Sequence, residues 1–144
     1  MIAQLLEGAI LVTLTVAIHG VVLGGCFRRI GLGQGTRKRS TLLDTWLLSR
    51  LAIWAVLAHL AEIALWGLFY DWRGIMPGAE ISFYFSAVTY ATIGYGDVTP
   101  PNGWRLLAAI EGLTGILMCA WSGGFLFAVV RSLRESSPEA RPSA

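Results

Sequence analysis

The chain has 144 residues, of which 55% are hydrophobic and 14% are charged, and its formal net charge is +2. This composition is too apolar for a disordered chain or an ordinary soluble domain, and it is typical of a membrane protein. No nucleophile and base and no set of metal ligands are spaced for catalysis, so we expect neither an enzyme nor an organic cofactor. Cys26 and Cys119 are expected to be reduced thiols that fill space among apolar side chains.

The first apolar segment covers residues 2–26, which is long enough to cross a bilayer as a helix. A signal peptide is the alternative, but it needs a positively charged start, and no Lys or Arg precedes Arg28. We therefore expect a retained transmembrane helix.

Residues 27–41 form the next segment, in which glycines at alternate positions interrupt any helix. Its basic residues are Arg28, Arg29, Arg37, Lys38 and Arg39. Basic loops between membrane helices lie on the cytoplasmic side, so the N-terminus is expected to be extracytoplasmic and the C-terminus cytoplasmic. Nucleic acid is the alternative partner for such a cluster, but the flanking apolar segments favour the topological role and no nucleic-acid binding is expected.

Residues 42–70 are predicted to form the second transmembrane helix. Asp44 lies in its first turn, where a carboxylate suits the helix dipole, and Arg50 can extend its charge back to the inner surface. His59 and Glu62 are three residues apart and therefore share one face of this helix.

Residues 80–91 are predicted to form a helix that is too short to cross a bilayer. Pro77 and Gly78 can begin it, and Glu80 lies at its positive N-terminal end. A re-entrant helix of this kind is tolerated where protein or water surrounds its ends.

The sequence Thr-Ile-Gly-Tyr-Gly-Asp at residues 92–97 follows directly. Gly94 and Gly96 adopt backbone conformations that side chains resist, so this segment can point several carbonyl groups in one direction. Four such segments around an axis would form rings of oxygen atoms that replace the water shell of a cation.

Residues 104–130 are predicted to form the third transmembrane helix, with Arg131 and Arg134 just beyond it. Residues 135–144 are polar and rich in Ser and Pro, and we expect them to be disordered. The resulting fold class is an all-α membrane protein with three transmembrane helices.

Residues 42–134 resemble the pore module of the potassium-channel superfamily, because residues 92–97 match its filter signature TVGYGD except for Ile93 in place of Val. The resemblance implies an outer helix at 42–70, a pore helix at 80–91, a selectivity filter at 92–97 and an inner helix at 104–130. It also implies a homotetramer in a lipid bilayer, and the bacterial inner membrane as its location. The implied ligands of K⁺ are the backbone carbonyls of Thr92, Ile93, Gly94 and Tyr95 and the Thr92 hydroxyl, with Gly96 completing the ion-binding segment.

Two positions behind the filter depart from the family pattern. Tyr84 and Phe85 stand where many relatives have two Trp residues, and Val88 stands where some bacterial members have a Glu that pairs with the filter Asp. We therefore expect the Tyr84 hydroxyl to donate a hydrogen bond to Asp97. Thr89 is a further candidate for supporting the filter.

Gly115 falls on the hinge glycine of the family when Arg105 and Leu106 are aligned with a similar pair in two-helix bacterial channels. A glycine weakens a helix by about 1 kcal/mol relative to Ala, which makes bending easier. Close packing of neighbouring helices explains a glycine in a membrane helix equally well.

His59, Glu62 and Glu111 are predicted to lie at a similar depth and to form one polar cluster. Unpaired acids inside a membrane are costly, so the cluster would join the outer helix to the inner helix. A proton-sensitive gate is the alternative role, because histidine titrates near neutral pH.

These features together predict a potassium-selective channel that conducts passively. A weakly selective cation channel and a non-conducting accessory membrane protein with the same fold are the alternatives.

Overall fold

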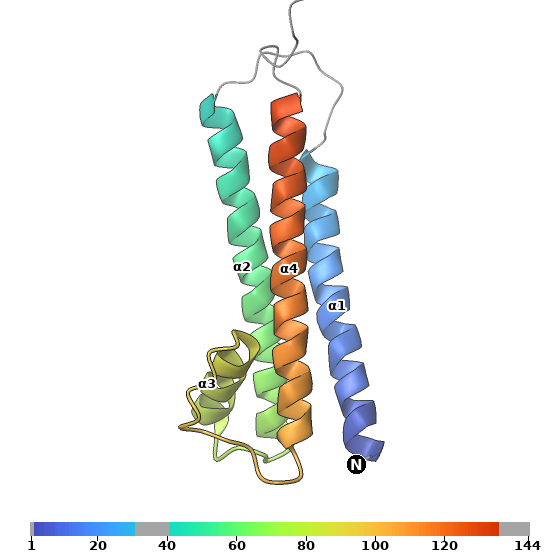
Figure 1. Cartoon of the computed structure of the whole chain (residues 1–144), viewed down its shortest axis with the longest axis vertical. Coiled ribbons are helices and arrows are strands. Elements are labelled where there is room, and N and C mark those ends of the chain that lie inside the picture. Colours follow the sequence, from blue (N-terminus) through green and yellow to red (C-terminus); the bar gives the residue numbers. More distant parts are fainter. Residues whose placement is uncertain (1, 31–40, 136–144) are drawn as a thin grey trace, which may run out of the picture.

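The computed structural model describes residues 2–30 and 41–135, and every regular element in these two ranges is an α-helix. The helices are α1 (Ile2–Ile30), α2 (Thr41–Trp72), α3 (Ala79–Tyr90) and α4 (Arg105–Glu135). The three long helices lie side by side with alternating directions, and the short α3 packs at one end (Figure 1). The expected all-α fold is confirmed.

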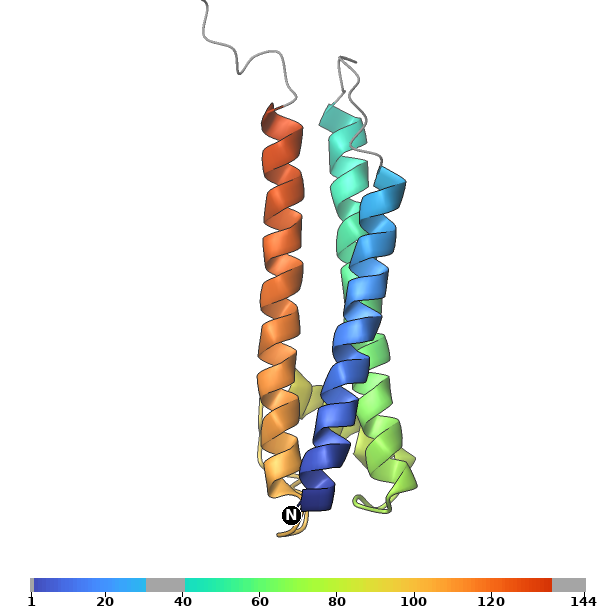
Figure 2. The same ribbon diagram turned by 90° about the vertical axis from the view of Figure 1, so that its right-hand side faces the viewer.

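Length and composition make each long helix able to cross a membrane. The windows of highest hydropathy average 2.1 in Ile2–Cys26, 1.8 in α2 and 1.9 in α4, and no more than a third of each window is buried within the chain. Many large apolar side chains therefore face outward, as they do on helices in contact with lipid or with other subunits. Figure 2 shows that α1 is inclined to α4, so that the two helices are close at the end where both begin and separate toward the other end.

Helix boundaries differ most from expectation where the sequence carries basic residues. α1 continues past Cys26 to Ile30, because the alternate glycines that break helices begin only at Gly31. α4 continues five residues beyond Val130 to Glu135, where Arg131 Nε donates to Glu135 at 2.8 Å, one turn later. The rest of the expected basic loop, 31–40, and the expected disordered tail, 136–144, lie outside the described residues.

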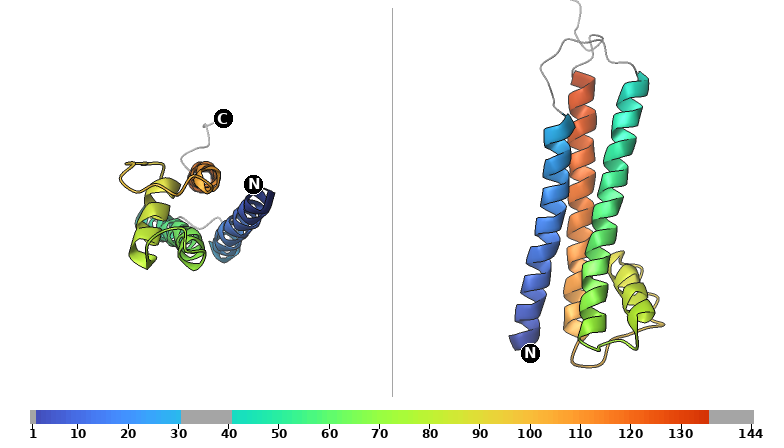
Figure 3. Two further views of the ribbon diagram at one scale, coloured as in Figure 1. Left: turned by 90° about the horizontal axis from the view of Figure 1, so that it is seen from below. Right: turned by 180° about the vertical axis from the view of Figure 1, so that it is seen from behind.

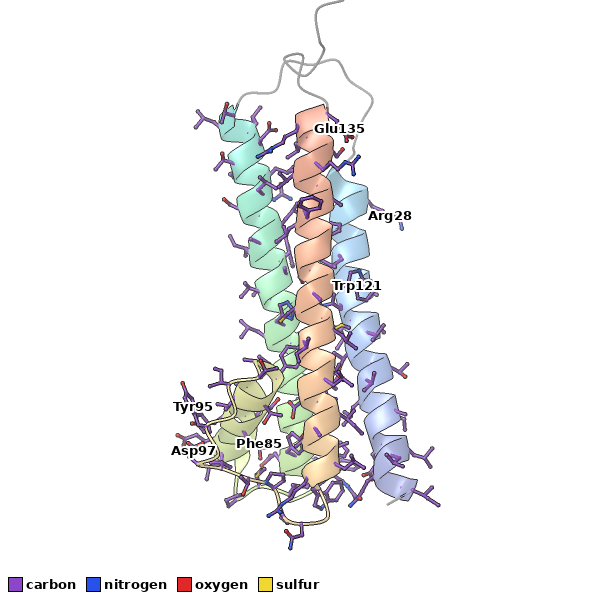
Figure 4. The ribbon with its side chains drawn as sticks, in the orientation of Figure 1. Arg28, Phe85, Tyr95, Asp97, Trp121 and Glu135 are labelled. Carbon is purple, nitrogen blue, oxygen red and sulfur yellow. The ribbon has the colours of Figure 1, made fainter. Side chains whose placement is uncertain are left out.

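α3 packs against α2 and α4 on the side of the bundle away from α1 (Figure 3). Trp66 and Tyr70 of α2 are fully buried here, and the Tyr70 ring meets the Phe85 ring of α3 edge to face at 5.2 Å. Figure 4 shows Phe85 between α3 and the long helices. The rest of this core comes from Leu11, Ile75, Met76 and Leu107.

Gly67 lets α2 and α3 approach closely. A Cβ atom at this position would lie 3.0–3.1 Å from the side chain and Cα of Phe83. The buried aromatic core and this close approach together fix the position of α3 and of the segment that follows it.

Candidate functional site

Residues 92–97 leave the C-terminal end of α3 as an irregular, exposed segment, and we call them the TIGYGD loop. Alternate residues of this loop have a positive φ, which is 58° at Thr92, 57° at Gly94 and 78° at Gly96. When residues with positive φ alternate with residues with negative φ, the carbonyl groups of successive peptides can point to the same side of the chain. The structure thus has the backbone alternation expected of Gly94 and Gly96.

The N–H groups of the TIGYGD loop bond back to the end of α3. Ile93 N and Gly94 N donate to the Val88 carbonyl at 2.9 and 3.3 Å, and Thr92 N donates to the Thr89 carbonyl at 3.0 Å. Among the hydrogen bonds of the described residues, none is accepted by a backbone carbonyl of residues 92–96. The oxygen atoms of the loop are therefore available to a ligand.

Thr92, a predicted ion ligand, has a backbone conformation that the sequence analysis missed. A β-branched residue with positive φ is a backbone outlier, and such conformations cost about 1–3 kcal/mol. Sequence reasoning assigns positive φ to glycines, so it offers no signal at Thr92. The two hydrogen bonds on either side of it, from Ala91 N to the Ala87 carbonyl and from Ile93 N to the Val88 carbonyl, hold this conformation.

Two large apolar side chains of the TIGYGD loop, those of Ile93 and Tyr95, are exposed. In the single chain, Ile93 is 53% exposed and Tyr95 is 70% exposed. Figure 4 shows Tyr95 and Asp97 at the outer edge of the molecule, away from the long helices. The described residues leave these two side chains uncovered.

The expected hydrogen bond behind the loop is present: the Tyr84 hydroxyl donates to Asp97 Oδ2 at 2.6 Å. Val98 N donates to Asp97 Oδ1 at 3.0 Å. The Tyr84 hydrogen bond lowers the pKa of the Asp97 carboxyl, and the same contact raises the pKa of Tyr84. Thr89 contributes through its backbone carbonyl, which accepts from Thr92 N.

Gly115 lies where α4 passes the end of α3. A Cβ atom on Gly115 would overlap the carbonyl oxygen of Tyr90 and lie 2.9 Å from its carbonyl carbon. α4 continues as a helix through this point. Of the two roles expected for Gly115, close packing is the one seen in this structure.

Five side chains from all four helices form a closed set of contacts near the middle of the bundle, which we call the polar ring. His19 Nδ1 lies 2.8 Å from Glu62 Oε1, and the Tyr90 hydroxyl donates to Glu62 Oε2. His59 Nδ1 lies 3.1 Å from the Tyr90 hydroxyl. Ser122 Oγ closes the ring at 3.1 Å from His19 Nε2 and 3.2 Å from His59 Nε2.

The prediction that Glu111 joins His59 and Glu62 is wrong. Glu111 is fully buried and forms a separate group, the Glu111 site, in which the Tyr70 hydroxyl donates to Oε2 at 2.7 Å and the Ser86 hydroxyl to Oε1 at 2.6 Å. Glu62 and Glu111 were grouped because they lie at a similar depth. Two hydroxyl groups of α3 separate them, since Ser86 donates to Glu111 and Tyr90 donates to Glu62.

The sequence analysis did not place His19 in a polar cluster. Its pairing with Glu62 depends on how α1 and α2 pack, and Ser122 and Tyr90 look like ordinary helix residues in the sequence. Three of the ring residues, His19, His59 and Glu62, have ligand atoms within 4.8 Å of one another and could hold a metal ion.

Two further polar contacts attach α1 to the bundle. Trp66 Nε1 donates to the Thr15 hydroxyl at 3.0 Å, and Arg73 pairs with Glu7 at 2.9 Å. α1 is therefore an integral part of the packed structure.

Comparison with known proteins gives one match. A family model described as an ion channel matches residues 56–132, a range that contains most of α2, all of α3 and the TIGYGD loop, and most of α4. No curated protein and no solved structure matches the chain.

Proposed function

Starting from the fact that this chain belongs to the ion channel family, we propose that it is a potassium-selective channel that conducts K⁺ passively through a pore of four identical chains. The family and the three helices able to span a bilayer make it an integral membrane protein. Potassium selectivity, the tetramer and the orientation in the membrane belong to the proposal.

The observation that carries the proposal is the backbone of the TIGYGD loop. Positive φ at Thr92, Gly94 and Gly96 and unoccupied carbonyl oxygens are what rings of cation ligands need. Four copies would supply the carbonyls of Thr92, Ile93, Gly94 and Tyr95 to stacked rings, each ring taking one oxygen from each chain.

α3 supports the same assignment as a pore helix. Its C-terminal end at Tyr90 lies beside His59, near the middle of α2, while its N-terminal end lies at the end of the bundle (Figure 1). The partial negative charge at a helix C-terminus stabilises a nearby cation. In the proposed pore, the negative end of α3 would lie inside the membrane, where a cation has lost its surrounding water.

Exposed apolar side chains support assembly into a tetramer. Ile93, Tyr95 and Tyr84 are exposed in the single chain, and so are large apolar side chains along α4. In the part of the chain that the structure describes, the TIGYGD loop is exposed at the outer edge, so one chain by itself does not enclose an ion. Neighbouring copies would complete the enclosure and cover Ile93 and Tyr95.

The cluster of basic residues sets the proposed orientation. Among the basic residues of the described ranges, Arg73 and Arg105 lie at the end of the bundle that holds α3, whereas Arg28, Arg50, Arg131 and Arg134 lie toward the opposite end. Figure 4 shows Arg28 and Glu135 at that opposite end. By the positive-inside rule this end is cytoplasmic, which leaves the N-terminus and the TIGYGD loop on the outer side.

A flux assay tests the proposal. Purified protein in liposomes with a K⁺ gradient should pass K⁺, barium should block the flux, and the reversal potential should follow K⁺ rather than Na⁺. A reversal potential that follows both ions would favour a weakly selective cation channel. Absence of flux from correctly inserted protein would favour a non-conducting accessory protein.

A further inference from the structure

The polar ring poses a hydrogen-counting problem that points to a ligand. Its five contacts each need one hydrogen atom. Ser122, Tyr90 and the two neutral imidazoles supply one each, and an ionised Glu62 supplies none, so one contact has no hydrogen. Buried polar atoms in proteins are normally all partnered, so the shortfall is filled by one further positive species, either a proton on an imidazole or a metal ion. The donor set and its geometry favour the metal ion.

We propose that His19, His59 and Glu62 form a binding site for one divalent transition-metal ion, with zinc as the best fit. Two imidazole nitrogens and one carboxylate oxygen are a donor set that zinc prefers, and zinc ligands at 2.0–2.1 Å in a tetrahedron lie about 3.3 Å apart. His19 Nδ1 and Glu62 Oε1 are 2.8 Å apart, and His59 Nδ1 and Glu62 Oε2 are 3.6 Å apart. All three ligand atoms lie within 4.8 Å of one another, so the side chains must shift to reach tetrahedral spacing.

Both histidines face the carboxylate through Nδ1, which leaves Nε2 of each ring free to donate. The two Nε2 atoms converge on Ser122 Oγ, at 3.1 and 3.2 Å. A hydroxyl oxygen has two lone pairs and can accept from both. With metal bound at Nδ1 of both rings, the two Nε2 contacts are satisfied, and Ser122 acts as a positioning residue that fixes the orientation of both imidazoles.

The fourth position of the metal falls to the Tyr90 hydroxyl or to water. Tyr90 already contacts both Glu62 and His59. His19 and Glu62 are fully buried, while the His59 side chain keeps 19% exposure, which gives the ion a route of entry. The site would link α1, which lies outside the residues that the ion channel family model matches, to α2 within them.

Zinc binding to the full-length protein tests the site without reference to ion conduction. Protein purified without a polyhistidine tag is dialysed against ZnCl₂, and bound zinc is measured by elemental analysis. We expect saturable binding of one zinc per chain. Absence of saturable binding would overturn the proposal, whether or not the protein conducts K⁺.

Variants then assign the ligands. His19→Gln and Glu62→Gln should each weaken zinc binding by more than tenfold, and Ser122→Ala by about tenfold, the lower end of what loss of an orienting partner costs. Glu111→Gln is the matched control, because it changes an equally buried Glu outside the ring, and zinc binding should be unchanged. Unaltered binding in both ligand variants would also overturn the assignment.

Cobalt(II) binding to the unmodified protein tests the same site and does not depend on whether the variants fold. Added to the unmodified protein, cobalt should give the intense visible absorption of a four-coordinate site, and zinc should displace it in a one-to-one ratio. The weak absorption of a six-coordinate aqueous ion would contradict a site made by these three side chains.

Discussion

The TIGYGD loop differs from the polar ring and the Glu111 site in where its polar atoms find hydrogen-bond partners. In the loop, no backbone carbonyl of residues 92–96 accepts a hydrogen bond from the described residues, and the side chains of Ile93 and Tyr95 are exposed. In the polar ring and the Glu111 site, each carboxylate oxygen has a partner within the chain. The loop therefore has polar atoms that the described residues do not satisfy, whereas the polar ring and the Glu111 site hold α3 in place through contacts within one chain.

This contrast predicts that changes in the loop abolish function with little effect on folding. Gly94→Ala and Gly96→Ala force a Cβ into a left-handed conformation, which costs about 1–2 kcal/mol and moves the carbonyl groups. We expect potassium-selective flux in liposomes to be lost in both variants. Gly24→Ala in α1 is the control, because a Cβ there has open space, and it should conduct normally. Unchanged selectivity in either loop variant would contradict the role of the loop.

Changes in the buried groups should have the opposite effect and lower stability first. Glu111→Ala removes the acceptor of the buried Tyr70 hydroxyl, which costs about 1–3 kcal/mol. The free energy of unfolding in detergent should fall by an amount near the upper end of that range, because a void is left as well. Glu111→Gln keeps an acceptor oxygen and should lose less. Equal stability of all three proteins would show that the Glu111 site does not hold α3.

Gly115 lies between the loop and the buried polar groups. We expect Gly115→Ala to lower the free energy of unfolding more than it alters conduction. In Gly115→Ala the new methyl group must displace the Tyr90 carbonyl, and overpacking of this kind costs about 1–3 kcal/mol. Gly123→Ala has open space around it and should be neutral or slightly stabilising. A normal unfolding free energy for Gly115→Ala together with altered channel opening would favour the hinge over close packing.

The smallest effect is expected at the Tyr84–Asp97 contact, which is exposed. The pKa of Asp97 is lowered in the folded protein. The stabilisation that its ionised form provides is therefore present above the ordinary Asp pKa, and it is lost as the pH falls through the lowered pKa of the folded protein. Tyr84→Phe should raise this pKa toward the ordinary value of about 3.9, as followed by NMR of the carboxyl group. Flux at neutral pH should persist. An unshifted Asp97 pKa in the variant would mean that the hydrogen bond does not form in solution.

The elements of the fold could be predicted because their signals are local. Three apolar segments, the short helix and the TIGYGD loop each follow from residues that are neighbours in the chain, and the Tyr84–Asp97 contact joins residues on either side of one turn. Helix ends were less accurate, since Ile30 and Glu135 are reached through residues that favour helix beyond the apolar segment. The φ of Thr92 could not be predicted, because hydrogen bonds to the end of α3 impose it on a residue that disfavours it.

What the sequence determined by itself is therefore the set of membrane helices and the chemistry of the loop, both of which depend on apolar length and on glycine spacing. The tertiary structure decided which buried polar groups meet. His19 and Glu62 are 43 positions apart and Ser122 and His19 are 103 positions apart, so no local pattern could pair them. Membrane helices of nearly uniform apolar character can be rotated against one another at little cost, and the close contacts at Gly67 and Gly115 fix which faces touch. That choice separated Glu111 from Glu62 and brought two histidines to one carboxylate.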